Sequence, residues 1–237
     1  MTSDAHLADT AAQLDTVAAA TERLLPAVAA LSDADLVDPS LLPGWTRGHV
    51  LAHLSRNADS LVNLLLWART GIETPQYASQ YLRDSDIEAG APRSLRDQVE
   101  DLTASAERWL ALARVMPADR WTATVRNRMG GEIPATRVIW MRLLEVEIHH
   151  VDLNIGYTPA DWPEDFTARL LAQSLSEVKP ADGAGFTVTA TDTGYTGAVG
   201  TQGPEITGPA ASLAAWLIGR APGADLTGDL PALAAWK

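Results

Sequence analysis

Cysteine is absent from this chain of 237 residues, and basic residues are scarce in it. Without cysteine the protein has no disulfide, no thiolate metal ligand and no cysteine nucleophile, so any thiol chemistry must use an external thiol. Lysine and arginine together number 18 against 30 aspartates and glutamates, which gives a net charge of −12 and a pI near 4.7. Because nucleic acids and anionic lipid surfaces bind basic patches, this balance argues against both kinds of partner.

Long apolar segments are absent as well. The sequence has no apolar run of about 18 residues that could span a bilayer. The polar residues 1–4 do not open a basic and then apolar secretory signal. We therefore expect a soluble, cytoplasmic protein that acts on small molecules, with no nucleic acid or membrane partner. A monomer is the simplest expectation for its oligomeric state.

Helical spacing dominates residues 1–158, which we predict to be one domain. Apolar residues recur every three or four positions over 5–31, 46–69, 94–116 and from 136 onward, which predicts four long amphipathic helices. We expect Thr46 to cap the start of the second helix and Gly71 to end it. Residues 72–92 hold few apolar residues and several turn formers, which predicts a long surface loop. Four long helices joined by loops favour a bundle, in which metal sites form from inward side chains of facing helices.

The pattern changes over residues 159–237, which we predict to be a second, smaller domain. Alternation of apolar and polar residues, as in the segment FTVTAT at 186–191, is typical of a strand. The expected elements are a helix over about 164–178, strands at 186–191, 195–199 and 205–208, a helix over 209–220, and a last short strand at 225–228. The predicted fold class is therefore α+β, with an N-terminal four-helix bundle and a small C-terminal α/β domain.

Histidines are concentrated in two of the predicted bundle helices. Four of the five histidines of the chain lie in residues 49–53 and 149–150. Residues four apart project from the same face of a helix, so Glu145 and His149 can aim at one point, and His53 from another helix can complete the set. Two histidines and one carboxylate with an open fourth position are the pattern of a catalytic metal site, with zinc as the first candidate.

The same helix offers a rival pair, Glu147 and His150. Each residue turns a helix by about 100°, so Glu145 and Glu147 point about 200° apart and cannot both face the bundle interior. Apolar residues bracket both pairs, and periodicity alone leaves the choice between them open.

Other polar residues near these pairs also allow two readings. A lone helical histidine such as His53 is more often a core or surface residue than a ligand. His49, four residues earlier, could pair with it or cap the start of the helix. Asp152, three residues after His149, could hydrogen-bond a ligand histidine or lie in solvent at the end of its helix.

Two arginines are candidates for binding a substrate. Arg83 falls in the predicted loop, and Arg220 directly precedes the turn at 221–223. Arginines at such positions are more often solvated than functional, but a bidentate guanidinium is what a small dicarboxylate would need. No phosphate-binding glycine motif and no serine nucleophile motif is present.

Three segments together carry a resemblance to a known family. They read LPGWTRGHVLAH at 42–53, ETPQY at 73–77 and WMRLLEVEIHHVDL at 140–153. In this combination the sequence resembles the mycothiol-dependent maleylpyruvate isomerases over essentially its whole length, including the closing Gly219 and Arg220. The resemblance implies a metal-binding four-helix bundle of the DinB-like type joined to a small α/β domain.

The resemblance also implies roles for individual residues. It makes His53, Glu145 and His149 the zinc ligands, in preference to the rival pair on the same helix. It makes Arg220 an arginine of the second domain that reaches toward the substrate or mycothiol. The chain departs from the family at Leu144, where relatives often carry arginine, so its finer substrate contacts are expected to differ.

The activity implied by the resemblance is cis–trans isomerisation of maleylpyruvate to fumarylpyruvate, in aromatic catabolism through the gentisate pathway. A metal-activated thiolate of mycothiol would add to the double bond, and rotation and elimination would follow, so that zinc and mycothiol are both cofactors. The bundle motifs are shared by many metal-dependent thiol transferases. A mycothiol S-transferase acting on another electrophile is therefore the main alternative, and a noncatalytic module with a relic metal site is the third.

Overall fold

The structure of the chain, a computed structural model, describes residues 3–181, 183, 185–234 and 236. Contacts divide the chain into two compact units, residues 1–155 and 156–237. Buried apolar side chains form a core in each unit. Within the described residues, no helix combines the length and the apolar character that crossing a bilayer requires.

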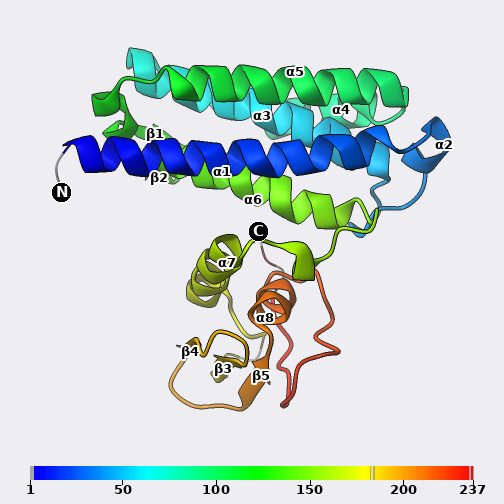
Figure 1. Cartoon of the computed structure of the whole chain (residues 1–237), viewed down its shortest axis with the longest axis vertical. Coiled ribbons are helices and arrows are strands. Elements are labelled where there is room, and N and C mark those ends of the chain that lie inside the picture. Colours follow the sequence, from blue (N-terminus) through cyan, green and yellow to red (C-terminus); the bar gives the residue numbers. More distant parts are fainter. Residues whose placement is uncertain (1–2, 182, 184, 235, 237) are drawn as a thin grey trace. The chain divides into compact units, whose positions relative to one another are not determined.

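Four long helices form the first unit and lie alongside one another (Figure 1). They are α1 (Ser3–Ala29), α3 (Arg47–Thr70), α5 (Leu95–Arg114) and α6 (Thr136–Asp152). Contacts run from α1 to α5, from α5 to α3, from α3 to α6 and from α6 back to α1, so each helix packs against two others. Leucines such as Leu24, Leu51 and Leu61 are buried between them, each contributing about 1.5–3 kcal/mol by leaving water. The predicted bundle is confirmed.

The predicted ends of α3 are confirmed as well. Thr46 is the N-cap, and its side chain accepts a hydrogen bond from the backbone N–H of His49. The His49 ring completes the cap, because its Nδ1 lies 3.2 Å from the backbone nitrogen of Thr46. Gly71 ends the helix with a φ of 75°, a left-handed conformation that glycine adopts without strain.

The long loop predicted at 72–92 is wrong in its second half, where the chain forms helix α4 (Gln80–Gly90) with Ser79 as N-cap. This helix buries little besides Ile87 and Gly90 against α3, so its sequence lacks an apolar stripe that would reveal it. The approach is close: a Cβ on Gly48 of α3 would lie 2.2 Å from the carbonyl oxygen of Ala91.

Short elements in the connections of the first unit were not predicted. They are α2 (Asp33–Leu36), the 3-10 helix η1 (Ala118–Thr122), and the antiparallel strands β1 (Thr124–Arg126) and β2 (Glu132–Pro134). Three-residue strands are too short to show alternation, which is why the sequence pattern missed this hairpin.

The second unit packs two helices on a three-stranded sheet, as the α/β prediction requires. Its elements are η2 (Pro159–Asp161), α7 (Glu164–Glu177), β3 (Phe186–Ala190), β4 (Thr196–Val199), β5 (Glu205–Gly208) and α8 (Ala210–Leu217). The central strand β3 pairs antiparallel with β4 and parallel with β5. The alternating side chains of Phe186, Val188 and Ala190 are buried. The strand predicted at 225–228 is wrong, because only one β-bridge, between Thr207 and Thr227, forms there.

Candidate active site

Helices α3 and α6 bring His53, Glu145 and His149 together inside the bundle. One ligand atom from each of these side chains lies within 4.8 Å of the others. Among the described residues, no other group of three histidines and carboxylates is placed closely enough to hold a metal ion. The three residues that the family resemblance implies as ligands therefore converge, although His53 and Glu145 lie 92 residues apart in the sequence.

The carboxylate of Glu145 lies between the two imidazoles. Its Oε2 is 2.9 Å from Nε2 of His53 and 3.1 Å from Nε2 of His149. The imidazole rings are perpendicular, with their centroids 4.7 Å apart. Both histidines thus aim the same ring nitrogen at one point, which is how histidines are arranged around a metal ion.

The charges of this cluster are strongly coupled. Burial acts to raise the pKa of Glu145, but the two histidines outweigh it and hold the pKa well below its usual range. Burial acts to lower the pKa of His149, but hydrogen bonds to Asp152 and Glu145 outweigh it and raise the pKa to about 8. Burial dominates at His53 and lowers its pKa, although Glu145 opposes the shift. At neutral pH the metal-free cluster therefore has a neutral His53 and a protonated, positively charged His149, which lies between the carboxylates of Glu145 and Asp152.

Asp152 fixes the orientation of His149 from behind. Its Oδ2 lies 2.8 Å from Nδ1 of His149, and its side chain is fully buried rather than solvated. Its backbone carbonyl accepts a hydrogen bond from the N–H of Leu41, which ties the end of α6 to the loop before α3. A carboxylate on Nδ1 keeps the proton on that nitrogen and leaves Nε2 free as a ligand.

The Trp45 ring packs against the ring of His53. The sequence did not predict this contact. The rings of Trp45 and His53 have centroids 5.5 Å apart and planes inclined by 60°. Trp45 also stacks on the ring of His49 at 6.2 Å. The residue precedes the N-cap of α3, so it lies outside the helical spacing by which the histidines were found.

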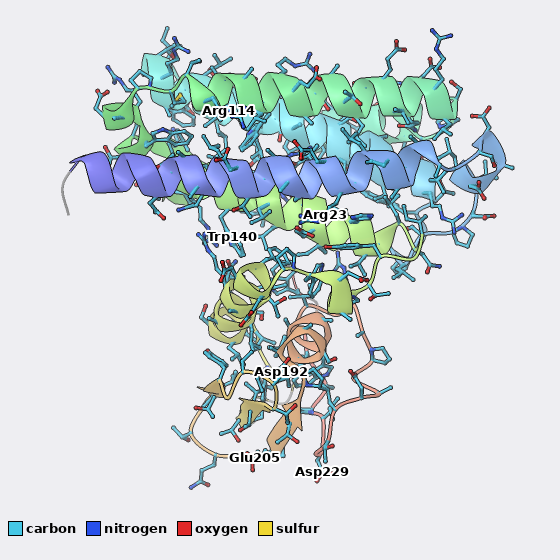
Figure 2. The ribbon with its side chains drawn as sticks, in the orientation of Figure 1. Arg23, Arg114, Trp140, Asp192, Glu205 and Asp229 are labelled. Carbon is cyan, nitrogen blue, oxygen red and sulfur yellow. The ribbon has the colours of Figure 1, made fainter. Side chains whose placement is uncertain are left out.

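The alternatives that the sequence left open are separated by the structure. His49 acts in the helix cap, and its Nε2 lies 3.3 Å from Oε2 of Glu88 on α4. Glu147 faces α1 instead of α3, and it forms an ion pair with Arg23 of that helix. Figure 2 labels Arg23, where α1 packs on α6.

Arg83 lies beside the cluster, on helix α4 instead of in a loop. Its Nη2 is 3.4 Å from Nδ1 of His53, and its Nη1 pairs with the Asp84 carboxylate at 2.7 Å. Its guanidinium carbon lies 5.8 Å from the centre of the Tyr77 ring. A cation is therefore available within the first unit, next to one of the three converging residues.

Arg220 belongs to the second unit, where it follows α8. Its Nη1 donates a hydrogen bond to the carbonyl of Ile218 at 3.2 Å. Gly219, with a φ of 71°, forms the turn in front of it.

Comparison with known families matches both parts of the chain. The family model of the mycothiol maleylpyruvate isomerase N-terminal domain matches residues 17–154. The model of the C-terminal domain of the same family matches residues 160–235. The chain belongs to the mycothiol maleylpyruvate isomerase family.

Solved structures of this family are similar over almost the whole chain. A crystal structure of the mycothiol-dependent maleylpyruvate isomerase has a TM-score of 0.88 and 29% sequence identity, covering 96% of this chain and 97% of that one. A histidine-to-alanine mutant of that enzyme has the same TM-score and coverage at 28% identity. No curated protein shows a significant match to the sequence. The predicted fold, a helical domain with a small α/β domain, is confirmed by this similarity.

Proposed function

We propose that the protein is a mycothiol-dependent maleylpyruvate isomerase, which converts the cis substrate to trans fumarylpyruvate. The observation that carries this proposal is the convergence of His53, Glu145 and His149 in a chain that belongs to this family along both domains. Their donor set is two neutral nitrogens and one carboxylate oxygen, and such a set leaves further coordination positions for a ligand.

The residues present fit a divalent metal ion, with zinc as our assignment. Both Nε2 atoms already lie within hydrogen-bond distance of the same carboxylate oxygen, and the three ligand atoms are within 4.8 Å of one another. Asp152 supplies the carboxylate that holds His149 in the ligating tautomer. When bound at such a site, the metal supplies Lewis acidity, which lowers the pKa of a coordinated thiol so that its thiolate exists at neutral pH.

His53 and Arg83 interact differently once Nε2 of His53 serves as a ligand. A neutral ring that ligates through Nε2 carries its proton on Nδ1, which then cannot accept a hydrogen bond from Arg83. The guanidinium is thereby released from His53. We assign it to a carboxylate of the substrate, for which a planar, permanently charged fork is suited.

Arg220 is our second candidate for substrate or mycothiol recognition and for stabilising developing negative charge. This assignment comes from its family resemblance and from the chemistry of the substrate, a keto diacid. In its own unit, Nη1 of this side chain donates a hydrogen bond to the backbone carbonyl of Ile218. The role is tested by Arg220→Ala, which should lower turnover much more than thermal stability.

The reaction needs a transient single bond at the double bond of the substrate. The thiolate sulfur of mycothiol adds to the double bond and forms a carbon–sulfur bond, and the alkene electron pair moves into the conjugated carbonyl to give an enolate. Rotation about the new single bond follows. Return of the electrons expels the sulfur and leaves the trans double bond, so the thiol is regenerated. In this proposal the positive charges of Arg83 and Arg220 stabilise the enolate, and Trp45 packs beside His53.

The decisive experiment is to mix the zinc-loaded protein with maleylpyruvate, with and without mycothiol, and to follow both the product and the thiol. We expect fumarylpyruvate only when mycothiol is present, with the thiol undiminished. His53→Ala should abolish this conversion with the fold retained. Stoichiometric loss of thiol into an adduct would show instead that the protein is a mycothiol S-transferase. No conversion and no adduct with bound zinc would overturn the proposal.

A further inference from the structure

Arg142 is a buried cation that the proposed reaction does not use. It lies on α6, one helical turn before Glu145, and is only 1% exposed. Its Nη1 donates to the carbonyl oxygen of Leu54 at 2.9 Å and to Oδ1 of Asn57 at 3.0 Å. Both acceptors are on α3, and Leu54 directly follows His53. The side chain therefore joins the two helices that carry the proposed metal ligands.

Arg142 is buried as a charged side chain without an anionic partner in the described part of the chain, which costs folding free energy. A residue kept only for stability would not be expected in such surroundings. No carboxylate of the described residues lies within ion-pair distance of it, and its Nη2 has no acceptor among them. Burial lowers its pKa to about 10, with Glu145 the first of the groups that oppose the shift. A buried charge without a paired partner costs free energy, and an apolar side chain of similar volume commonly stabilises a core better. Local violations of this kind are expected at functional sites.

The hydrogen bonds of Arg142 connect α3 and α6 next to the proposed metal ligands. At this place a change in the distance between the two helices would move the ligands apart. The backbone carbonyl of Leu54 lies one residue beyond His53, and Arg142 holds it from the same helix as Glu145 and His149. Asn57 is one turn further along α3 and is also buried. A shift or rotation of either helix would change the 2.9 Å separation between Nε2 of His53 and Oε2 of Glu145.

We propose that Arg142 is a positioning residue of the active site, which fixes α3 against α6 so that His53, Glu145 and His149 converge with the geometry a metal ion requires. This inference rests on the proposed metal site, and it assigns Arg142 no contact with the substrate. Residues that orient metal ligands from outside typically contribute about 10–100-fold to metal affinity.

The direction in which zinc affinity changes on substitution of Arg142 distinguishes a positioning role from a purely electrostatic effect of its charge. Removing a positive charge near a metal ion would by itself strengthen cation binding, because like charges repel. Loss of positioning would weaken it. Arg142→Met removes the charge and keeps much of the volume, whereas Arg142→Lys keeps the charge and loses the planar fork. If Arg142 positions the ligands, both variants bind zinc more weakly.

The matched control is Arg23→Met, because Arg23 also pairs across helices with α6 but through Glu147 on its other face. For each protein, zinc affinity is measured by competition with a chelator, the Co²⁺ derivative by visible absorption, and the stability of the metal-free form by thermal unfolding. We expect a zinc affinity about 10–100-fold weaker in both Arg142 variants, with an altered Co²⁺ spectrum. Arg23→Met should lose stability but keep its zinc affinity within about twofold and its Co²⁺ spectrum unchanged.

Other outcomes distinguish this inference from the proposed function. Zinc affinity in Arg142→Met and Arg142→Lys equal to or stronger than that of the original protein would overturn the positioning role. Equal weakening in Arg23→Met would also overturn it, since general destabilisation would then explain the loss.

If the unaltered protein binds no zinc, the proposed metal site fails on its own. The crystal structure of metal-free Arg142→Lys then decides, since an unchanged separation between His53 and Glu145 would overturn the inference. If Arg142→Met does not fold, the Lys variant carries the whole test.

Discussion

Helix α6 presents the same two residue types on two of its faces, with opposite results. On one face Glu145 and His149 meet His53 of α3, and the carboxylate is shared between two imidazoles. On the other, Glu147 is 1% exposed and pairs with Arg23 of α1. Glu145 therefore shares its cluster with a histidine that can lose its proton, whereas Glu147 is neutralised by a permanently charged arginine.

The different partners of Glu145 and Glu147 show that the helix packed against each face of α6 determines what the acid on that face can bind. An imidazole opposite a carboxylate can lose its proton and become a ligand, so that the cluster can accept a divalent cation. A guanidinium stays protonated at any physiological pH and excludes a second cation. The identity of the residue at position 53 or 23 therefore matters as much as the acid on α6.

The largest expected effect comes from changing Glu145, the acid on the face that carries the proposed metal ligands. Glu145→Gln keeps the size of the side chain but removes the anionic ligand, and we expect zinc affinity to fall by more than about 100-fold, since even residues behind the ligands contribute 10–100-fold. Mycothiol-dependent isomerisation should be lost with the metal. Zinc content after dialysis and turnover measure this. A Glu145→Gln protein that retains stoichiometric zinc and normal turnover would exclude Glu145 as a ligand.

A smaller effect is expected one layer behind the ligands. Asp152→Asn removes the charge that holds the proton on Nδ1 of His149 but keeps a polar side chain at 0% exposure. We expect zinc affinity to fall by about 10–100-fold, with part of the activity restored at high zinc concentration. Chelator competition at several zinc concentrations measures it. Unchanged affinity would show that Asp152 only helps to hold the end of α6 through its packing.

Helical periodicity predicted which residues share each face of α6 but not which face meets His53. The spacing of Glu145 and His149, and that of Glu147 and His150, are both compatible with one helix face, and apolar residues surround both pairs. The choice depends on whether α3 or α1 packs opposite, which is a tertiary property. Only the family resemblance favoured one pair at the sequence level, Glu145 and His149, and this is the pair that the structure brings to His53.

Other parts of the molecule show the same limit. The ends of α3 followed from Thr46 and Gly71, because capping is local chemistry. Helix α4 was missed, because it is largely exposed and its short buried face gives no apolar stripe. Arg83 was consequently assigned to a loop. The spacing of three residues between Arg142 and Glu145 was visible in the sequence, but the burial that makes Arg142 notable depends on α3.

On the face of α6 that carries Glu145 and His149, protons should compete with the metal ion for binding. No such competition is expected on the face that carries Glu147. The pKa of His149 is raised to about 8 in the metal-free cluster, and a metal ion binds the deprotonated ring. The apparent zinc affinity should therefore fall by about tenfold for each pH unit below 8 and level off above it. Chelator competition between pH 6 and 9, with proton release measured in weak buffer, tests this dependence. An affinity that is independent of pH over that range would contradict a protonated His149 in the metal-free protein.

The smallest effect on the site is expected from the second face. Glu147→Gln keeps the shape of the side chain but leaves Arg23 without its anionic partner. Breaking a buried ion pair costs about 3–5 kcal/mol, but the Arg23 side chain is 39% exposed and can regain water, so we expect a loss of about 1–3 kcal/mol in the free energy of unfolding. Urea unfolding measures this loss, and zinc affinity and turnover at a temperature where the variant is folded should match those of the unaltered protein. A drop in zinc affinity comparable to that of Asp152→Asn would mean that the two faces of α6 are coupled through the helix. The ion pair between Arg23 and Glu147 would then also help to set the rotation of α6 that aims Glu145 at His53. In that case the two faces of α6 would differ only in how strongly each affects zinc binding.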